Sequence, residues 1–435
     1  MFLTDPMTVS AAMLLIIYAV IFSEKIHRTN AAIIGAICMV GIGLWMDFYS
    51  QEQALMAIDA NTILLLAAMM MLVGLFRQTG AFEYLAILIA NISKAQPARL
   101  MIYLCIAVSV ISMFLDNVTT IIIFAPLTLL ITRILKLNPL PFLVAEAMLS
   151  NVGGIATLVG DPPNIMIGSA ANIDFTRFLI HMAPPVFTVW VFSMSYLLWT
   201  FRDELKLPIS ASHKLHLDRR HAIKDPAKLI KTLIAIVFVV ILFFIHHLLK
   251  LYPAYVAFAG LALALLLISP EPESLFKEIN WSVLFFFAGL FVIVGGVESS
   301  GLLHLIGAEL SHLAEDPQML LLTCLLLMWV AALLSAFVDN IPFTVTMIPI
   351  IAGLESHGIN IQPLWWALAL GVGLGGNGTH IGATANIIVV SELEKSKIPN
   401  AEISPLQWMR KGFPVMFTGL TVSSVFYILM FDYFT

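Results

Sequence analysis

Two Asp-Asn pairs lie within the most apolar stretches of the chain, Asp116-Asn117 and Asp339-Asn340. An ionised carboxylate is costly in hydrocarbon unless it is paired or lies in a water-filled cavity. Each aspartate also precedes an apolar run, where it would cap the first turn of a helix. Capping explains the local geometry, but serine or asparagine would cap at lower cost at membrane depth. The pairs therefore predict a role for Asp116 and Asp339 in proton or cation coupling.

Two glycine-rich segments interrupt other apolar runs, GGIATLVGDPPN at 153–164 and GGNGTHIGATAN at 375–386. Glycine weakens a helix by about 1 kcal/mol and an interior proline by about 3, so neither segment is predicted to be continuous helix. Pro162 suits the first turn of a restarting half-helix, with Asp161 as its cap. Irregular backbone at membrane depth is tolerated where it lines a cavity or is buried in protein. Its carbonyl groups and polar side chains can bind an ion or a hydroxylated solute; these side chains are Thr157, Asn164, Thr379 and Asn386.

The two segments and the two Asp-Asn pairs form a repeat. Thr157 matches Thr379 at an offset of 222 residues, and Asp116 matches Asp339 at an offset of 223. A simple proline kink would explain one break, but not a matched pair. Interrupted helices at corresponding places in two halves of an apolar chain indicate the binding site of a secondary transporter.

Several polar groups break this symmetry. Asp161 stands opposite Ala383, His380 opposite Leu158, Asn377 opposite Ile155, and Glu146 opposite Leu368. Glu146, Asp161 and His380 are therefore candidates for proton coupling alongside the two repeated aspartates, and Asn377 is a candidate binding residue. A structural role remains the alternative for Glu146 and His380.

The composition is that of a polytopic membrane protein. Of the 435 residues, 60% are hydrophobic and 11% are charged, whereas soluble domains have about 25% charged residues. We predict an all-α fold with ten spans, at about 6–23, 30–47, 61–76, 140–172 (broken), 182–201, 228–248, 253–269, 281–298, 363–391 (broken) and 411–433. Segments 98–134 and 317–354 are predicted re-entrant hairpins with the aspartates at their tips. Segments 79–95 and 300–315 are predicted to be interfacial helices.

The basic residues predict the orientation. With the N-terminus outside, all of the 22 Lys and Arg residues except Arg177 and Lys250 fall on one side, which by the positive-inside rule is cytoplasmic. Both termini are then outside, and the polar linker 202–227 is cytoplasmic. Each half has five spans, so the second half is predicted to be inverted relative to the first.

The hairpin tips FLDNVTTIIIFAPL and FVDNIPFTVTMIPI resemble the Ser-Asn-Thr tips of divalent anion/sodium symporters. The glycine-rich breaks resemble the unwound loops of the same ion transporter superfamily. With IKDPAKL at 223–229, the chain looks most like the branch that contains arsenite/antimonite efflux permeases and the melanosomal P protein. The resemblance covers nearly the whole chain.

This resemblance implies an elevator-type transporter that forms a homodimer. The first repeat would be 1–201, with scaffold helices at about 1–60 and transport-unit elements at about 98–172. After the linker, the second repeat would be 228–435, with scaffold at about 228–280 and transport-unit elements at about 317–391. The implied substrate site includes Asp116, Asn117, Gly154, Thr157, Asn164, Asp339, Asn340, Thr379 and Asn386.

The chain departs from the symporter pattern at both tips. Aspartate replaces the hydroxyl residue before each asparagine, and Val118 or Ile341 replaces the one after it. A dicarboxylate would meet two like charges at such a site. We therefore expect a cation or a neutral polyhydroxy solute that is exchanged for protons. Arsenic or antimony hydroxide is neutral near pH 7 and rich in hydrogen-bond donors, and it would not require paired cysteines.

Four functions follow from these features. The first is proton-coupled efflux of arsenite or antimonite across the inner membrane, and the second is sodium/proton antiport on the same aspartates. The third is an anion channel of the P-protein type. The fourth, an intramembrane aspartyl protease, is disfavoured because Leu115 and Val338 precede the aspartates and the repeat makes them equivalents. We expect no enzyme activity, cofactor, metal site or nucleic-acid partner. The chain has no ATP-binding loop, so any ATPase would be a separate soluble subunit.

Overall fold

A computed structural model describes residues 5–435 except 24, 95, 207–221, 315–316, 338 and 400; the side chains of Phe22, 309–314 and 317–318 are also outside the description. The described residues form 22 helices and no strands. Most of the predicted linker 202–227 therefore lies outside the described residues. Its two ends form the short helix α11 (Arg202–Leu205) and the start of α12.

The helices of the two halves follow one another in the same order. The first half contains α1 (Pro6–Phe22), α2 (Arg28–Trp45), α3 (Gln51–Met56), α4 (Ala60–Gln78), α5 (Ala81–Ile92), α6 (Pro97–Ser112), α7 (Asn117–Leu135), α8 (Leu140–Gly154), α9 (Pro162–Ala170) and α10 (Phe175–Thr200). The second contains α12 (Pro226–Ile245), α13 (Pro253–Ile268), α14 (Pro272–Phe276), α15 (Trp281–Ser299), α16 (Leu302–Ala314), α17 (Pro317–Phe337), α18 (Asn340–Glu355), α19 (Gln362–Gly375), α20 (Thr384–Ser396) and α21 (Pro405–Leu429), followed by α22 (Phe431–Phe434). The breaks between α8 and α9 and between α19 and α20 lie where the glycine-rich segments predict them.

Eight helices are long and apolar enough to cross a membrane, as expected for a polytopic membrane protein. They are Arg28–Trp45, Ala60–Gln78, Asn117–Leu135, Phe175–Thr200, Pro226–Ile245, Trp281–Ser299, Met319–Phe337 and Pro405–Leu429. This set includes α7 and most of α17, one arm of each predicted hairpin. Length and hydropathy alone therefore do not separate a hairpin arm from a span.

The last long helix of each half begins earlier than predicted. Helix α10 starts at Phe175 rather than 182, and α21 starts at Pro405 rather than 411. The Asp174 carboxylate accepts the backbone N–H of Arg177 at 2.9 Å, and Ser404 and Gln407 cap each other's backbone. The predicted spans followed hydrophobicity and so missed these polar first turns.

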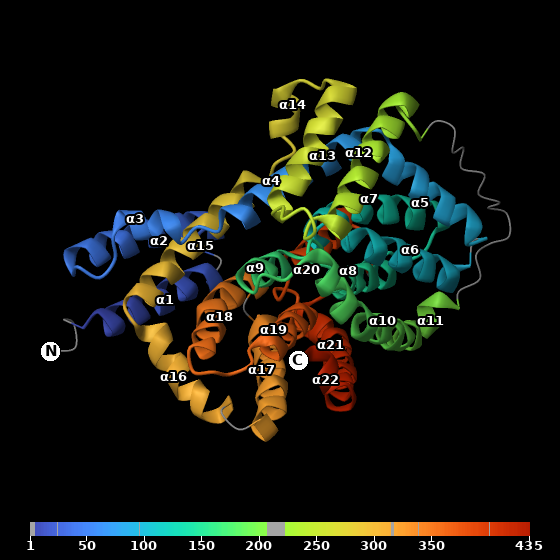
Figure 1. Ribbon diagram of the computed structural model, residues 1–435. Coiled ribbons are helices and arrows are strands. Elements are labelled where there is room, and N and C mark those ends of the chain that lie inside the picture. The colour runs from blue at the N-terminus through green and yellow to red at the C-terminus, as the bar shows by residue number, and fades with distance from the viewer. Residues whose placement is uncertain are drawn as a thin grey trace.

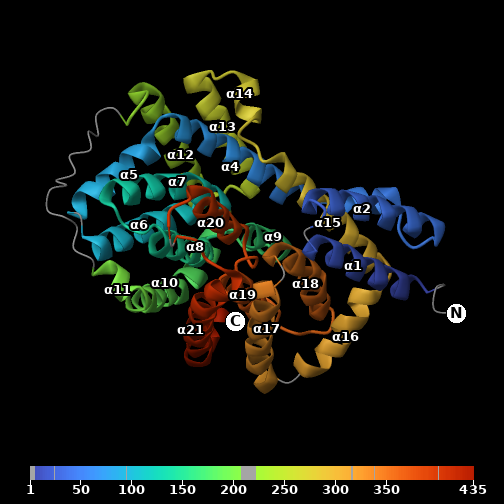
Figure 2. The same ribbon diagram turned by 180° about the vertical axis from the view of Figure 1, so that it is seen from behind.

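The helices form two groups that meet near the centre of the molecule (Figure 1). The first group, which we call the frame, consists of α1–α4 and α12–α15 with the segments between them; within it α1 and α3 pack on α2 and α15, α2 packs on α15, and α13 packs on both α4 and α12. The second group, which we call the core group, consists of α6–α10 and α17–α21, with α6 on α8, α17 on α19 and α10 on α21. The second segment of each broken helix packs in the other half: α9 contacts α18 and α19, while α20 contacts α7 and α8 (Figures 1 and 2). The ends of the broken helices therefore meet where the halves cross.

Glycine allows close contact between a hairpin and its broken helix. A Cβ atom at position 153 would lie 2.5 Å from the carbonyl oxygen of Ser109 in α6. A Cβ at 375 would collide in the same way with the carbonyl oxygen of Ala332 in α17. Because backbone atoms form the obstacle, the helices themselves would have to separate to accept a side chain.

We predict that Gly153→Ala destabilises the protein by about 1–3 kcal/mol, the usual cost of overpacking. The measurement is the apparent melting temperature of purified protein in detergent. Gly41→Ala is the matched control, because a Cβ there meets nothing within 4 Å and alanine is the better helix former. A Gly153→Ala protein that melts at or above the wild-type temperature would contradict this account of the α6–α8 contact.

Candidate functional site

One asparagine satisfies the unwound backbone in each break. The Asn164 side-chain amide donates to the carbonyl oxygens of Gly154 (3.0 Å) and Thr157 (2.9 Å). The Asn386 amide donates to those of Gly376 (2.7 Å) and Thr379 (2.9 Å). Both side chains are almost fully buried. Five of the residues predicted to bind cargo in the breaks therefore use much of their hydrogen-bonding capacity on the loop itself; they are Gly154, Thr157, Asn164, Thr379 and Asn386.

The threonines attach each loop to its own hairpin. The hydroxyl of Thr157 donates to the carbonyl of Met113, and that of Thr379 donates to the carbonyl of Ala336. A serine completes each attachment: Ser112 donates to the carbonyl of Ser150 at 2.8 Å, and Ser335 to that of Val372 at 2.9 Å. Each hairpin tip and its adjacent break thus form one hydrogen-bonded unit, and Thr157 and Thr379 act as positioning groups.

A buried chain of amides joins the two units. Asn117 donates to the side-chain oxygen of Asn151 at 3.0 Å. Asn151 in turn donates to the side-chain oxygens of Asn377 (2.9 Å) and Asn386 (3.1 Å). The sequence analysis missed Asn151 because its repeat counterpart, at an offset of 222, is Gly373. Its only signal in the sequence is an amide two residues before Gly153 in an apolar run.

Asp161 joins the second hairpin tip to the first break. It stands at the N-cap position of α9, but its side chain makes no capping hydrogen bond, so the predicted capping role is wrong. Its carboxylate instead accepts the side-chain amide of Asn340 at 3.2 Å. It is 3% exposed and interacts electrostatically with both Asp339 and Asp116. The three aspartates therefore converge on one region, as the repeat predicts for the two at the tips.

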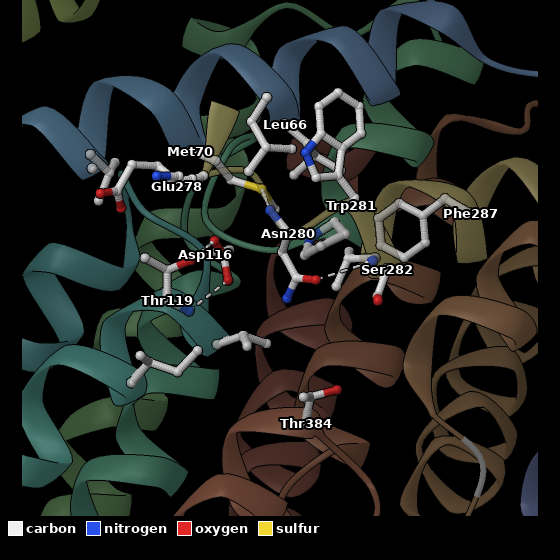
Figure 3. A pocket seen from close by; sticks show the side chains of 18 of the residues that line it. Leu66, Met70, Asp116, Thr119, Glu278, Asn280, Trp281, Ser282, Phe287 and Thr384 are labelled. Atoms are coloured by element: carbon white, nitrogen blue, oxygen red, sulfur yellow. Dashed lines mark hydrogen bonds between the residues drawn. The ribbon is translucent and has the colours of Figure 1, made fainter. Parts of the chain in front are cut away.

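Asp116 caps α7 and faces a cavity. Its carboxylate accepts the backbone N–H of Thr119 at 2.8 Å and the Thr119 hydroxyl at 2.6 Å (Figure 3). The cavity has a volume of about 510 Å³ and also contains side chains from α2, α4, α15, α18 and α20. Its charged lining residues are Arg28, Arg77, Asp116, Lys277 and Glu278. Among the described residues, Asp116 has no ion-pair partner.

Asp339, in contrast, is paired with Arg28. The guanidinium Nη1 of Arg28 lies 2.7 Å from the Asp339 carboxylate and 2.9 Å from the hydroxyl of Thr384. Arg28 is the first residue of α2, and the sequence analysis counted it only as a basic residue of a loop. Its role was not visible because the partner lies 311 residues away. The two tip aspartates, equivalent by sequence, thus have different electrostatic environments.

A second cavity has a volume of about 300 Å³. Some of its lining residues correspond in sequence to lining residues of the first cavity, but its charged residues differ. Val73, Gly74 and Arg77 of α4 line the first cavity, and the residues 221 positions later, Val294, Gly295 and Glu298 of α15, line the second. The charged lining residues of the second cavity are Asp59 and Glu298. Over the described residues, the first cavity therefore has a largely basic rim and the second an acidic one.

Glu146 and His380 lie apart from these groups. Glu146 is fully buried in α8, where one carboxylate oxygen accepts the Thr128 hydroxyl at 2.6 Å. Thr128 is 12 residues, or about 18 Å of helix, from Asp116. His380 is half-buried, and its Nδ1 has no hydrogen-bond partner among the described residues. Neither side chain lines the two cavities.

Broken helices that meet beside a polar cavity in an apolar helical protein are features of membrane transporters. The model of the CitMHS family, described as citrate transporter, matches residues 18–371, and the chain belongs to this family. It is 38% identical to an uncharacterised transporter of Mycobacterium tuberculosis over 96% of this chain and 97% of that protein. It is 36% identical to a 46 kDa membrane protein of Mycobacterium leprae, again over 96% and 97%. It is also 30% identical to the human P protein over 97% of this chain, which spans 60% of the P protein.

The Asn151 amide cluster yields a prediction. Asn151→Ala leaves the side-chain oxygens of Asn377 and Asn386 without this donor, at a cost of about 1–3 kcal/mol for a buried unsatisfied group. We expect a lower melting temperature and faster hydrogen–deuterium exchange at 376–386, with α12 and α13 unchanged. Ser195→Ala is the control, since the exposed Ser195 hydroxyl bonds only within α10, to the carbonyl of Val191. Unchanged exchange at 376–386 would show that Asn151 does not support the second break.

Proposed function

We propose that the chain is a proton-coupled secondary transporter built from two inverted repeats, 1–201 and 228–435. The shared helix order of the halves supports the repeat, as do the recurring hydrogen bonds of Asn164 and Asn386 and of Thr157 and Thr379. Five spans in each half and the distribution of Lys and Arg support the inversion. In this arrangement the frame is the scaffold, and the core group carries the site across the membrane in an elevator movement.

The cargo site lies between the hairpin tips, with Asp116 as its charged group. One observation carries this assignment: the Asp116 carboxylate faces the larger cavity and, among the described residues, is not neutralised by a cation. Asp339 is held by Arg28, and Asp161 is buried against Asn340. A carboxylate in this setting attracts a proton, a small cation, or a neutral solute that donates hydrogen bonds.

Arsenite or antimonite, as the neutral hydroxide, is the cargo that we propose. Its hydroxyl groups would donate to Asp116, and proton movement in the opposite direction would drive its efflux. The resemblance to arsenite permeases supports this choice, and the acids at the hairpin tips disfavour an anion. Sodium/proton antiport on the same carboxylates is the alternative, since a sodium ion would also suit Asp116.

Citrate is a second candidate because of the family's description and the basic rim of the larger cavity. Arg28, Arg77 and Lys277 could attract an anion there. However, Arg28 and Arg77 are already paired with Asp339 and Glu278. A free citrate passing beyond the rim would approach Asp116 and Asp161. We therefore rank citrate below a neutral hydroxylated cargo, and an anion channel of the P-protein type below both.

The predicted membrane orientation places each cavity on one side of the membrane. If Lys and Arg mark the cytoplasm, the larger cavity opens inward and the acidic one faces outward. The protein would lie in the inner membrane with both termini outside and the linker 202–227 cytoplasmic. A homodimer and, for arsenite efflux, a separate soluble ATPase are the partners that we expect.

The test is uptake into everted membrane vesicles under an imposed pH gradient, with arsenite, antimonite, sodium and citrate as separate probes. We expect gradient-dependent uptake of arsenite and antimonite. Asp116→Asn retains a capping side chain but loses the charge, and a charged hydrogen bond contributes about 1.5–3 kcal/mol. Its uptake rate should therefore fall by about tenfold or more, and Asp339→Asn should also be impaired.

Asp174→Asn is the matched control. Asp174 caps α10 as Asp116 caps α7, but it does not line either cavity. Proton exchange with sodium alone would establish the antiporter instead, and uptake of citrate would overturn the assigned cargo. Current beyond any exchange stoichiometry would indicate a channel. Proton exchange at the wild-type rate in both Asp116→Asn and Asp339→Asn would disprove the coupling role of these residues.

A further inference from the structure

We propose that Arg28 is a tethered competitor for Asp339: it occupies this carboxylate in the absence of cargo and ties the frame to the core group. A proton or cargo-linked cation that neutralises Asp339 then releases Arg28, and this release permits movement of the core group. The inference rests on the transport function proposed for this site.

Arg28 links the two groups of helices. It belongs to α2 of the frame, and its guanidinium carbon lies 5.2 Å from the ring centroid of Phe286 in α15, also in the frame. The same guanidinium donates to Asp339, which caps α18, and to Thr384, the first residue of α20. One side chain thus contacts the second hairpin tip and the restarted half of the second broken helix, which belong to the core group.

This link differs from the other ion pairs in the described part of the chain. Arg77 and Glu278 pair at 2.6 Å, but α4 and the segment before α15 both belong to the frame. Lys224 pairs with Glu83 of α5 near the linker, and the remaining pairs are local in sequence. The Arg28–Asp339 pair therefore joins the frame to a hairpin tip through charge, and neutralisation of the tip weakens it.

An uncharged link lies beside it. The Tyr18 hydroxyl of α1 lies 2.9 Å from the carbonyl oxygen of Pro342 and 2.8 Å from the Thr346 hydroxyl, both in α18. Protonation of Asp339 does not change these bonds. Of the Arg28 and Tyr18 contacts described here, only that of Arg28 involves the charge of the tip.

The charges around Asp339 favour this response. Arg28 approaches from α2, while Asp161 interacts electrostatically with Asp339 from the start of α9 and Asp116 interacts with Asp161 from the first tip. Among the described residues, Arg28 is the one cation that forms an ion pair with any of these three acids, and its partner is Asp339. A second cation or proton that enters the cluster reduces the attraction that holds Arg28 in place.

The link is also one-sided. Helix α2 begins with Arg28, whereas the equivalent helix α13 begins with Pro253. Lys250, which lies 222 residues after Arg28, forms no ion pair with Asp116 among the described residues, so in this structure the pair forms at one of the two tips only. Arg28 therefore favours the conformation in which the larger cavity is open.

The proposal is tested by measuring, between two spin labels, the distance from the frame to the core group in the full chain. Spin labels are placed at the exposed residues Gln51 of α3 and Thr421 of α21, in nanodiscs, with the three native cysteines replaced by alanine. We expect Arg28→Gln to raise the population of a second distance by about fivefold or more, a typical size for conformational coupling. Asp339→Asn breaks the same pair from the other side and should give the same shift.

Arg77→Gln is the matched control, because it removes an equal charge from the lining of the same cavity and breaks an ion pair within the frame. It should leave the distance distribution unchanged. The double variant Arg28→Asp/Asp339→Arg, which restores the pair with exchanged charges, should return the wild-type distribution. Arg28→Lys should restore it only in part, since an ammonium group lacks the planar guanidinium that packs over the Phe286 ring.

A wild-type distribution in both Arg28→Gln and Asp339→Asn would overturn the proposal. So would an equal shift in Arg77→Gln, because the effect would then follow from cavity charge alone. These outcomes are separate from failure of the transport function, which is judged by uptake in Asp116→Asn. If Arg28→Gln does not fold, Asp339→Asn decides the question, because it leaves Arg28 and the cap position intact.

Discussion

The structure depends on one constraint, the need of each backbone carbonyl and N–H at membrane depth for a hydrogen-bond partner. A helix meets this need along its length, but the segments after Gly154 and Gly376 do not form helix. Asn164 and Asn386 meet it there, because each bonds at least two carbonyls of its own break. Because these amides belong to the restarted helices α9 and α20, the loop and the following helix are held in one arrangement. The breaks are thus ordered parts of the fold.

The ordered breaks in turn hold the hairpin tips. Thr157 and Thr379 bond the hairpin backbone where each tip turns, so the tips cannot move independently of the broken helices. Asn151 then connects the first tip to the second break. A displacement of one half of the core group is therefore transmitted to the other through buried amides. This rigidity is what an elevator movement would need, because the site has to travel as a unit.

The sequence predicted the elements whose motifs match in the two halves and missed the unmatched polar contacts. The two breaks, the helix pairs α6–α7 and α17–α18 and the capping by Asp116 and Asp339 follow from local composition and from the matched offsets. Asn151 corresponds to Gly373 in the second half and Arg28 lies outside the matched motifs, and the partners of both lie far away in the chain. Asp161 was wrongly predicted to cap α9, because its carboxylate has Asn340 as a tertiary partner. Long-range contacts between unlike residues are therefore the part that pattern analysis could not supply.

The duplicated backbone that we propose, with unlike charges in its halves, would have a consequence for the direction of transport. If the two halves were identical in charge as well as in fold, the two open states would be equal in energy and a gradient alone would set their populations. Here Arg77 of the larger cavity is replaced by Glu298 in the smaller one, and Arg28 serves only one of the two tip acids. A cation therefore meets a more attractive rim at the smaller cavity and, within the larger one, must compete with the protein's own guanidinium for Asp339. In the proposed mechanism, the charges rather than the backbone would therefore set the preferred direction of transport.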